Sequence, residues 1–222
     1  MERMMLSVVI PALNAASTLG ACLDSVRDAD ETIVVDGGST DSTAAVAESS
    51  GARLLRSPRG RGVQLAAGAA AAKGGWLLFL HADTRLALGW RDAAESHMAR
   101  SLGNAACFRF RLDADERRAR LVEAGVALRV RALGLPYGDQ GLLLSRRLYD
   151  EVGGFRPLAL MEDVDLVRRI GARRIDRLEV DAVTSAERWR SGGWLRRSGR
   201  NLLCLGLYQC GMSPERVARL YG

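Results

Sequence analysis

Short apolar runs of strand type alternate with segments of helical spacing through the first half of the chain. The runs are LSVVI at 6–10, TIVV at 32–35, ARLLR at 52–56 and WLLFL at 76–80. After the first run, Leu19, Cys22, Leu23 and Val26 recur at the spacing of one helix face. This alternation predicts an α/β fold with a largely parallel sheet, in which ligands bind at the carboxyl ends of the strands.

The second half is less regular, but its patterns predict further strands and helices. Strands are expected in ACFRFRL at 106–112, LLLS at 142–145 and IDRLEVDAV at 175–183, and helices in the arginine-rich segment at 116–133 and in MEDVDLVRRIG at 161–171. From Trp194 onward the pattern is helical, breaks near Gly211 and restarts where Ser213 caps a helix that begins with Pro214. We therefore expect a helical C-terminal segment.

The size and charge of the chain limit the kinds of partner it is expected to have. At 222 residues it is long enough for one α/β domain with a sizeable core, and its formal net charge is +6. Lys73 is the only lysine, so the excess is arginine, which coding bias explains as well as binding does. A basic chain suits nucleic acid, anionic lipid or a phosphorylated substrate. The signature motifs of nucleic-acid modules are not visible, so we expect no nucleic-acid partner.

Cysteine spacing and apolar run length bear on the compartment. Cys22, Cys107, Cys204 and Cys210 include no CxxC pair, which argues against a zinc site or a redox pair. The N-terminal apolar run is short, and LLCLGLYQC at 202–210 is too short to span a membrane. We expect a cytoplasmic protein with reduced thiols, either soluble or peripheral to a membrane.

Two acids directly follow predicted strands. Asp36 begins DGGSTDS, whose glycines let the backbone approach a ligand, although an ordinary strand-to-helix turn favours the same residues. Asp83 ends the strand-type stretch FLHAD two residues after His81, and in an extended chain both side chains would point to the same side. One carboxylate suffices for a divalent cation that bridges a diphosphate, because phosphate oxygens and waters complete its shell. Three readings are open for His81, a nitrogen ligand, a phosphate donor or a residue held by loop hydrogen bonds, and by itself the residue favours the last.

The later motifs combine acids with an arginine–tryptophan pair. MEDVDL brings Glu162, Asp163 and Asp165 to the start of a helix, and we expect Glu162 and Asp163 at its mouth rather than on its buried face. An acid there is either a helix cap or a general base that accepts a hydroxyl proton. AERWR brings Arg188, whose fork fits diphosphate oxygens, and Trp189, whose ring offers a sugar an apolar platform.

The order of these motifs is more specific than any one of them. SVVIPALNAASTL, VVDGGSTDST, GWLLFLHADT, a GGF turn, MEDVDL and ERW follow one another as in the family 2 glycosyltransferases of the GT-A fold, which the chain resembles from Ser7 to about Trp189. FLHADT with PYGDQG, EDVDL and SPERVARLY resembles the bacterial branch labelled arsenosugar-biosynthesis-type glycosyltransferases. The resemblance implies one GT-A domain over residues 1–222, with a Rossmann-like, mostly parallel sheet flanked by helices. Its parts are a nucleotide-binding half at about 1–85, an acceptor half at about 86–190 and C-terminal helices at about 191–222.

The same resemblance implies roles for individual residues. Binding of a nucleotide-sugar donor falls to Pro11, Ala12, Asn14, Asp36, Arg61 and Arg188, and binding of the acceptor to Asp139, Gln140 and Trp189. Asp83 and His81 are implied at a Mg²⁺ or Mn²⁺ ion, with Asp163 as catalytic base and Glu162 beside it. His81 stands where many relatives carry the first acid of a DxD motif.

The leading hypothesis is an inverting glycosyltransferase that moves a sugar from a nucleotide diphosphate to an acceptor hydroxyl. A related enzyme with a polyprenyl phosphate acceptor and a catalytically silent sugar-nucleotide binder are the alternatives. A membrane-surface adaptor is a further alternative, suggested by the helical segment 194–208, where Arg196, Arg197 and Arg200 flank leucines. The C-terminal helices also suit loose contact with a membrane surface or a homodimer. A dinucleotide-dependent dehydrogenase is disfavoured, because no GxGxxG follows the first strand.

Overall fold

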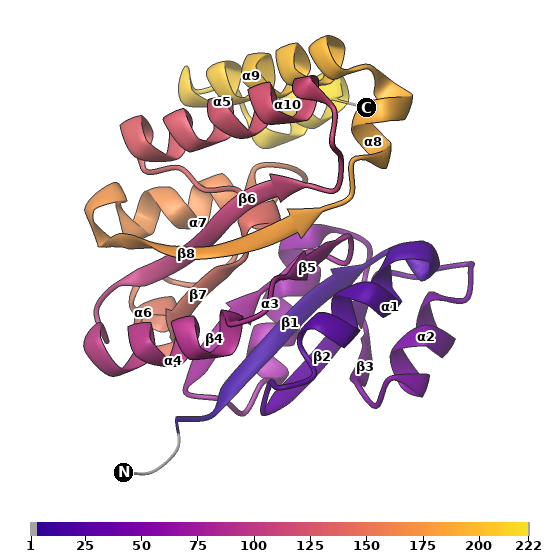
Figure 1. Ribbon diagram of the computed structural model, residues 1–222, viewed down its shortest axis with the longest axis vertical. Helices are drawn as coiled ribbons and strands as arrows, with labels where there is room; N and C mark the ends of the chain where they lie inside the picture. Colours follow the sequence, from indigo (N-terminus) through magenta and orange to yellow (C-terminus); the bar gives the residue numbers. More distant parts are fainter. Residues whose placement is uncertain (1–3, 222) are drawn as a thin grey trace.

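The central sheet joins strands from the whole length of the chain. The structure is a computed structural model that describes residues 4–221, and over this range eight strands form one sheet in the order β3-β2-β1-β4-β7-β6-β8-β5 (Figure 1). The strands are β1 (Leu6–Ala12), β2 (Glu31–Asp36), β3 (Arg53–Arg56), β4 (Trp76–Phe79), β5 (Thr84–Leu86), β6 (Ala105–Leu112), β7 (Leu142–Ser145) and β8 (Ile175–Thr184).

Helices follow most of the strands. They are α1 (Ala16–Ser25), α2 (Thr43–Ser49), α3 (Arg61–Ala71), α4 (Trp90–Arg100), α5 (Arg117–Leu133), α6 (Arg146–Glu151), α7 (Glu162–Ile170), α8 (Glu187–Gly192), α9 (Trp194–Gln209) and α10 (Pro214–Tyr221). Short 3-10 turns η1 (Gly138–Gln140) and η2 (Ala172–Arg174) complete the described elements. The predicted helical C-terminal segment, broken near Gly211 and restarted at Pro214, is confirmed.

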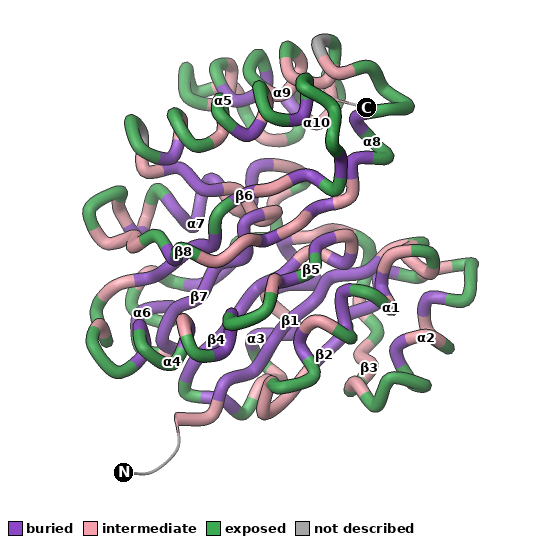
Figure 2. The backbone as a smooth tube through the Cα atoms, in the orientation of Figure 1, coloured by how far each residue is buried: buried purple, intermediate pink, exposed green. Residues whose placement is uncertain are grey.

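The sheet has a hydrophobic core on each face. In β1, Val8 and Ile10 pack into the core beneath α1 and α4, while Val9 between them packs into the core with α3, α6 and α7. Because neighbouring strand residues point to opposite faces, a strand buried on both sides must be apolar throughout. This explains why LSVVI is apolar except at Ser7, whose buried hydroxyl donates to the Glu31 carboxylate at 2.6 Å, and Figure 2 shows the inner strands buried almost throughout.

The sheet is parallel in its first half and mixed in its second. The pairings β1–β2, β2–β3, β1–β4 and β6–β8 are parallel, whereas β4–β7, β6–β7 and β5–β8 are antiparallel. The predicted α/β class is confirmed, but the sheet is less uniformly parallel than the alternation indicated. Strand direction in the second half depends on how the chain returns to the sheet, which local periodicity does not encode.

The C-terminal helices pack beside the start of α7. Cys204 and Leu205 of α9 and Val217 of α10 form one buried cluster with Met161 and Val164. In Figure 1 these helices lie with α5 at the opposite end of the molecule from β1, β2 and β3. This packing places α9 and α10 above the carboxyl ends of the central strands.

The search for membrane-spanning helices, made on residues 4–221, finds no helix long and apolar enough to cross a bilayer. Cys22, Cys107 and Cys204 are free and buried, and Cys210 is free and exposed.

Candidate active site

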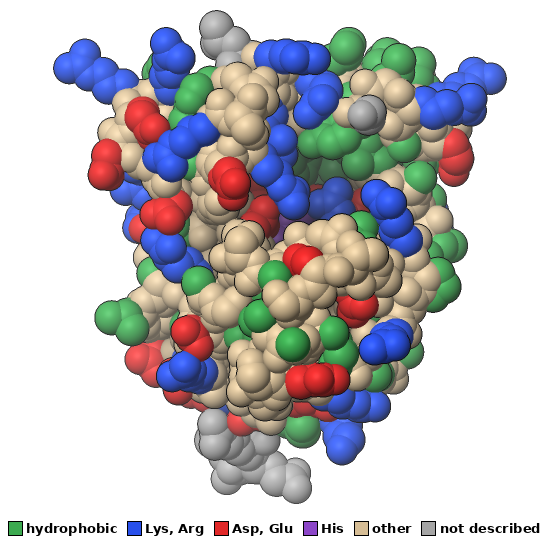
Figure 3. Space-filling model, turned by 90° about the vertical axis from the view of Figure 1, so that its right-hand side faces the viewer, with side chains coloured by type: hydrophobic (Ala, Val, Ile, Leu, Met, Phe, Trp, Pro, Cys, Tyr) green, Lys and Arg blue, Asp and Glu red, His purple; other side chains and the backbone are tan. Residues whose placement is uncertain are grey.

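A cleft of about 740 Å³ lies at the carboxyl ends of β1 and β4. Its walls come from the loop after β1, the start of α3, the turn after β4, the η1 segment, the start of α7, and helices α8 to α10. Figure 3 shows a hollow on this side of the molecule, with basic side chains gathered around its mouth. The position agrees with the ligand site expected for such a sheet.

Most of the predicted site residues line this cleft. Those that do are Pro11, Ala12, Asn14, Arg61, His81, Asp83, Asp139, Asp163, Arg188 and Trp189. The other three, Asp36, Gln140 and Glu162, lie behind its surface and are buried. The structure therefore assembles residues from positions 11 to 189 into one site and leaves three of them in supporting positions.

The loop after β1 is held by a chain of hydrogen bonds that begins at Asp36. Its carboxylate accepts from the Ser39 backbone N–H and hydroxyl, and the Ser39 hydroxyl accepts from the Asn14 N–H at 2.9 Å. Asn14 Oδ1 in turn accepts from the Thr40 N–H at 2.9 Å. Asn14 has a φ of +49°, in the left-handed region that asparagine tolerates better than most residues. Asp36 thus shapes the cleft wall from behind.

Gln64 of α3 fastens the ends of β1 and β2 together, and the sequence analysis did not identify it. Its buried amide donates to the carbonyls of Ala12 and Val35, each at 2.8 Å. A Cβ on Gly37 would lie 3.0 Å from the Gln64 amide, so the glycine makes room for this contact. A glutamine within an alanine-rich helix carries no sequence signal of this role.

The segment that carries His81 and Asp83 is a turn rather than an extended chain. The Thr84 N–H donates to the His81 carbonyl at 3.1 Å, which closes the turn, yet both side chains still line the cleft. Loss of solvation, followed by the nearby Arg61 guanidinium, lowers the pKa of His81 to about 4, so the imidazole is neutral at neutral pH. A Cβ on Gly138 would lie 2.3 Å from His81 Nε2. The glycine in PYGDQG therefore lets this loop close over the imidazole.

Asp83 is the carboxylate best placed to meet a metal ion. Its side chain retains 16% exposure, and Oδ2 lies 3.8 Å from Nη1 of the largely exposed Arg188. Within the described part of the chain, residues 4–221, no group of three His, Cys, Asp or Glu side chains is arranged to hold a metal. A site with one exposed carboxylate fits an ion whose remaining ligands come from phosphate oxygens and water.

Asp163 and Asp139 face the cleft from adjoining segments. Asp163 Oδ2 accepts the Gly138 N–H at 2.9 Å, which fixes the carboxylate against the loop over His81. Burial raises the pKa of Asp139 to about 6, and its Oδ1 is buried with no hydrogen-bond partner among the described residues. Both carboxylates, Asp163 and Asp139, are therefore candidates to receive a proton.

Met161, which precedes α7, has a φ of +66°, a strained value for a side chain of this size.

Glu162 does not lie at the helix mouth, contrary to the expectation from MEDVDL, and Asp165 is buried as well. Glu162 is 1% exposed, and its Oε1 lies 2.8 Å from Arg61 Nε. Asp165 pairs with Arg169 at 2.6 Å and with Arg156 at 3.3 Å. On a helix with apolar residues on two sides, these two acids fall on the inner face, and their charge is offset by Arg169 of the same helix and by Arg61 and Arg156 from other segments. Only Asp163 of the three faces the cleft.

Trp189 lies under the C-terminal helices and is only 8% exposed. Its ring stacks on Trp194, with centroids 5.9 Å apart, and the Arg197 guanidinium lies 5.4 Å from its centre. It shares a buried cluster with Val122 and Val126 of α5. The face that Trp189 offers to the cleft is therefore small.

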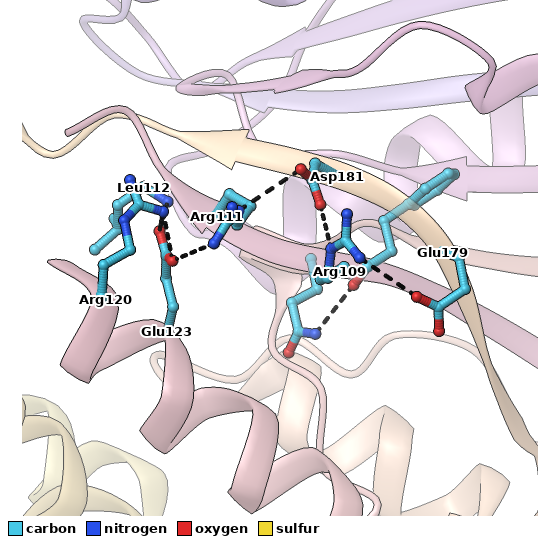
Figure 4. Close-up of polar contacts among 9 residues, drawn as sticks. Arg109, Arg111, Leu112, Arg120, Glu123, Glu179 and Asp181 are labelled. Carbon is cyan, nitrogen blue, oxygen red and sulfur yellow. Dashed lines mark hydrogen bonds and ion pairs between the residues drawn. The ribbon is translucent and has the colours of Figure 1, made fainter. Parts of the chain in front are cut away.

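A polar network holds α5, and with it this cluster, against the sheet. The buried Glu123 carboxylate pairs with Arg111 at 2.7 Å and accepts the Leu112 N–H at 2.8 Å (Figure 4). Arg111 also lies 3.6 Å from Asp181 of β8, so the network reaches the neighbouring strand. Glu123 thereby connects α5 to β6 and, through Arg111, to β8, behind the part of the cleft wall that contains Trp189.

Comparison with solved structures identifies the class of fold. The glucosyl-3-phosphoglycerate synthase of Mycobacterium tuberculosis, solved with Mg²⁺ and uridine diphosphate, superposes with a TM-score of 0.66 at 24% identity, over 94% of this chain and 80% of that one. The same enzyme with Mn²⁺, uridine-diphosphate-glucose and phosphoglyceric acid gives a TM-score of 0.64. The GT-A fold predicted from the sequence is confirmed.

The chain belongs to the family Glycosyl transferase family 2, whose sequence profile matches residues 7–157. A PGL/p-HBAD biosynthesis glycosyltransferase of Mycobacterium bovis is 42% identical over 99 residues, which cover 37% of this chain and 36% of that protein. The glucosyl-3-phosphoglycerate synthase of Mycolicibacterium paratuberculosis is 35% identical over 92 residues, or 35% of this chain and 28% of that protein. The matches thus span about a third of the length of these relatives.

The buried Arg61–Glu162 pair leads to a prediction about stability. Burial raises the pKa of Glu162, Arg61 opposes that shift and Asp163 adds to it. When the pKa of a carboxyl group rises on folding, the folded protein becomes less stable as the pH increases from the unfolded pKa of that group, here 4.5, through its folded pKa. Without Arg61, the pKa of Glu162 in the folded protein is higher still. Arg61→Ala should therefore continue to lose stability above about pH 7, where the parent curve levels off, and the additional loss should reach about 1 kcal/mol at pH 8.

Urea denaturation at a series of pH values measures this difference. Arg59→Ala, at a nearby cleft arginine, is the matched control and should follow the parent curve. The double variant Arg61→Ala/Glu162→Gln should lose this additional slope above pH 7 and keep only the pH dependence of other groups, such as Asp139. A parent-like slope for Arg61→Ala would show that the ion pair does not stabilise the fold.

Proposed function

We propose that the chain is an inverting glycosyltransferase, with residues 1–222 acting as one catalytic domain in the cytoplasm. The observation that carries the proposal is the placement of Asp83 and Asp163 in one cleft at the carboxyl ends of the strands, with Arg188 beside Asp83. In this proposal Asp83 acts at the leaving diphosphate, and Asp163 acts at the attacking hydroxyl. Family membership gives the same reaction class.

The proposed reaction is a single displacement at the anomeric carbon of the donor sugar. The acceptor oxygen forms the new bond as the bond from that carbon to the diphosphate oxygen breaks, and the bonding electrons leave with the diphosphate. Asp163 takes the proton from the acceptor hydroxyl, and Arg188 offsets the charge that develops on the leaving group. Fixed by the Gly138 N–H, the Asp163 carboxylate does not need to reorient as the proton moves.

The nucleotide is assigned to the side of the cleft formed by the loop after β1. Pro11, Ala12 and Asn14 line this side, and Asp36 holds it in shape. Arg61 stands at its floor, where its contact with Glu162 keeps the guanidinium in place. The acceptor is assigned to the opposite side, with Asp139 and Trp189 at the surface. Gln140, whose amide donates to the Phe108 carbonyl at 3.1 Å, supports that side from behind.

A divalent ion, Mg²⁺ or Mn²⁺, is proposed at Asp83. It would stabilise negative charge on the departing diphosphate. The similar synthase structures are described with uridine diphosphate and either Mn²⁺ or Mg²⁺, which supports the assignment. His81 is neutral and lies two residues away, but the Gly138 backbone covers its Nε2 side. We assign His81 a supporting role at the metal rather than an essential one.

A polyprenyl phosphate acceptor is the alternative that one surface observation favours. Leu202 and Leu203 on α9 are 64% and 59% exposed, and Arg196 on the same helix is exposed as well. Exposed leucines beside arginines suit the surface of a membrane that contains anionic lipid, or a second copy of the chain. Sedimentation with vesicles separates these two partners.

Removal of the Asp83 charge should abolish metal-dependent nucleotide binding. Asp83→Asn keeps the shape of the side chain, so the fold should survive while the metal loses its protein ligand. A nucleoside diphosphate with Mg²⁺ or Mn²⁺ should raise the melting temperature of the parent but not that of the variant. Glu187→Gln, which removes another acid of the cleft wall, is the control and should behave as the parent does. An unchanged metal-dependent shift in Asp83→Asn would remove Asp83 from the metal site.

Removal of the Asp163 charge should separate catalysis from donor binding. Asp163→Asn should lower sugar transfer by about two to four orders of magnitude, the usual effect of a positioned acid or base. Its affinity for the nucleoside diphosphate should stay within about twofold of the parent, because a base need not touch the diphosphate. Asp139→Asn is the comparison, since that acid faces the same side. A large loss in Asp139→Asn with full turnover in Asp163→Asn would reverse the assignment.

A further inference from the structure

Arg197, in the second turn of α9, lines the cleft without a carboxylate partner. Among the ion pairs between residues 4 and 221, none involves Arg197, and its Nε is buried without a hydrogen-bond acceptor. The Trp189 ring lies beneath the guanidinium at 5.4 Å. Burial lowers the pKa of Arg197, and so do the neighbouring Arg188 and Arg200, while Tyr221 and Asp83 act in the opposite direction without cancelling the shift. A guanidinium desolvated in this way is costly unless an anion compensates it.

Of the other three arginines that line the cleft, Arg59 is exposed to solvent, and the remaining two have acidic neighbours. Arg61 contacts Glu162 at 2.8 Å, and Arg188 lies 3.8 Å from Asp83. The proposed donor site thus already contains a cation beside the metal-binding acid. The charge of Arg197 is in excess of what that site requires.

Asn201 extends the same surface by one helical turn. It lies four residues after Arg197, so both side chains fall on the same face of α9, and it also lines the cleft. Its Oδ1 is buried without a partner among the described residues, and rotation of the amide by half a turn would present an N–H donor in its place. The two side chains together offer a fork and an amide to a single oxyanion.

The packing of α9 assigns this pair to the acceptor side. Cys204 and Leu205, on the following turn, pack against Val164, which directly follows Asp163. The helix that carries Arg197 and Asn201 is thus anchored to the segment that carries the proposed base. A group bound by the pair would lie on the side from which a hydroxyl must approach Asp163.

We infer that Arg197 and Asn201 bind an anionic group, of the phosphate monoester class, on the acceptor. This inference rests on the proposed transferase function and adds the chemical class of its acceptor. The phosphate could belong to a small soluble molecule or to a lipid headgroup at a membrane surface. The binding chemistry is the same in both cases, so the two sources are distinguished by the probe.

Calorimetric titration of the full chain, saturated with a nucleoside diphosphate and Mg²⁺, tests the inference. The probes are glycerol 3-phosphate for a soluble source and vesicles that contain phosphatidic acid for a lipid source. Arg197→Ala should weaken binding of the active probe by about tenfold or more, as expected for a charge-assisted hydrogen bond. Arg197→Lys, which keeps the charge but loses the fork, should lie between this variant and the parent. Arg100→Ala removes an exposed arginine at the end of α4, outside the cleft and outside α9, and should stay within about twofold of the parent with either probe; with glycerol 3-phosphate, Arg196→Ala should do so as well.

Separate results would contradict the inference and the function on which it rests. If the parent binds the nucleoside diphosphate but neither phosphate probe, or if Arg100→Ala weakens the probe as much as Arg197→Ala does, the anion site is refuted. If Arg197→Ala lowers the affinity for the nucleoside diphosphate by the same factor as the affinity for the probe, Arg197 belongs to the donor site and the inference fails. A parent that binds no nucleoside diphosphate refutes the transferase function itself.

Discussion

The buried contact between Arg61 and Glu162 joins the two halves of the molecule at the cleft. Arg61 begins α3, which packs on the parallel strands, and Glu162 begins α7, some hundred residues later in the sequence. Next to Arg61, a Cβ on Gly62 would lie 2.3 Å from the Arg156 carbonyl, so the backbones approach closely at the same place. Since Asp163 follows Glu162, the ion pair that joins the halves also fixes the position of the proposed base.

The acids of the site consequently divide into two kinds. Glu162 and Asp36 are buried: Glu162 pairs with Arg61 and so joins α7 to α3, and Asp36 accepts hydrogen bonds that hold the loop after β1. Asp83 and Asp163 keep a free side toward the cleft, where a ligand can reach them. Such a division is expected where catalytic groups must be held rigidly, because their own positions depend on charges and dipoles that are already satisfied.

The sequence predicted the site better than it predicted the supports behind it. The roles proposed for Asp83 and Asp163 come from the resemblance to family 2 glycosyltransferases, and the end of the strand before Asp83 is visible as an apolar run. Burial of Glu162 was missed because it depends on Arg61, a partner far away in the sequence. Gln64 was missed because two backbone carbonyls, which have no sequence signature, require it. The mixed direction of the second half of the sheet was missed for the same reason, since strand pairing is set by tertiary contacts.

The central claim is that this cleft breaks the bond between a sugar and a nucleoside diphosphate. It is tested most directly by incubating the full chain with a panel of nucleotide-diphosphate-sugars and Mn²⁺ or Mg²⁺, and by identifying the nucleotide product by mass spectrometry. The account predicts that at least one donor is consumed and that its nucleotide appears as the diphosphate, because the bond at the anomeric carbon is the one that breaks. Release of the nucleoside monophosphate, or binding of donors without turnover of any of them in the presence of acceptor extract, would contradict it.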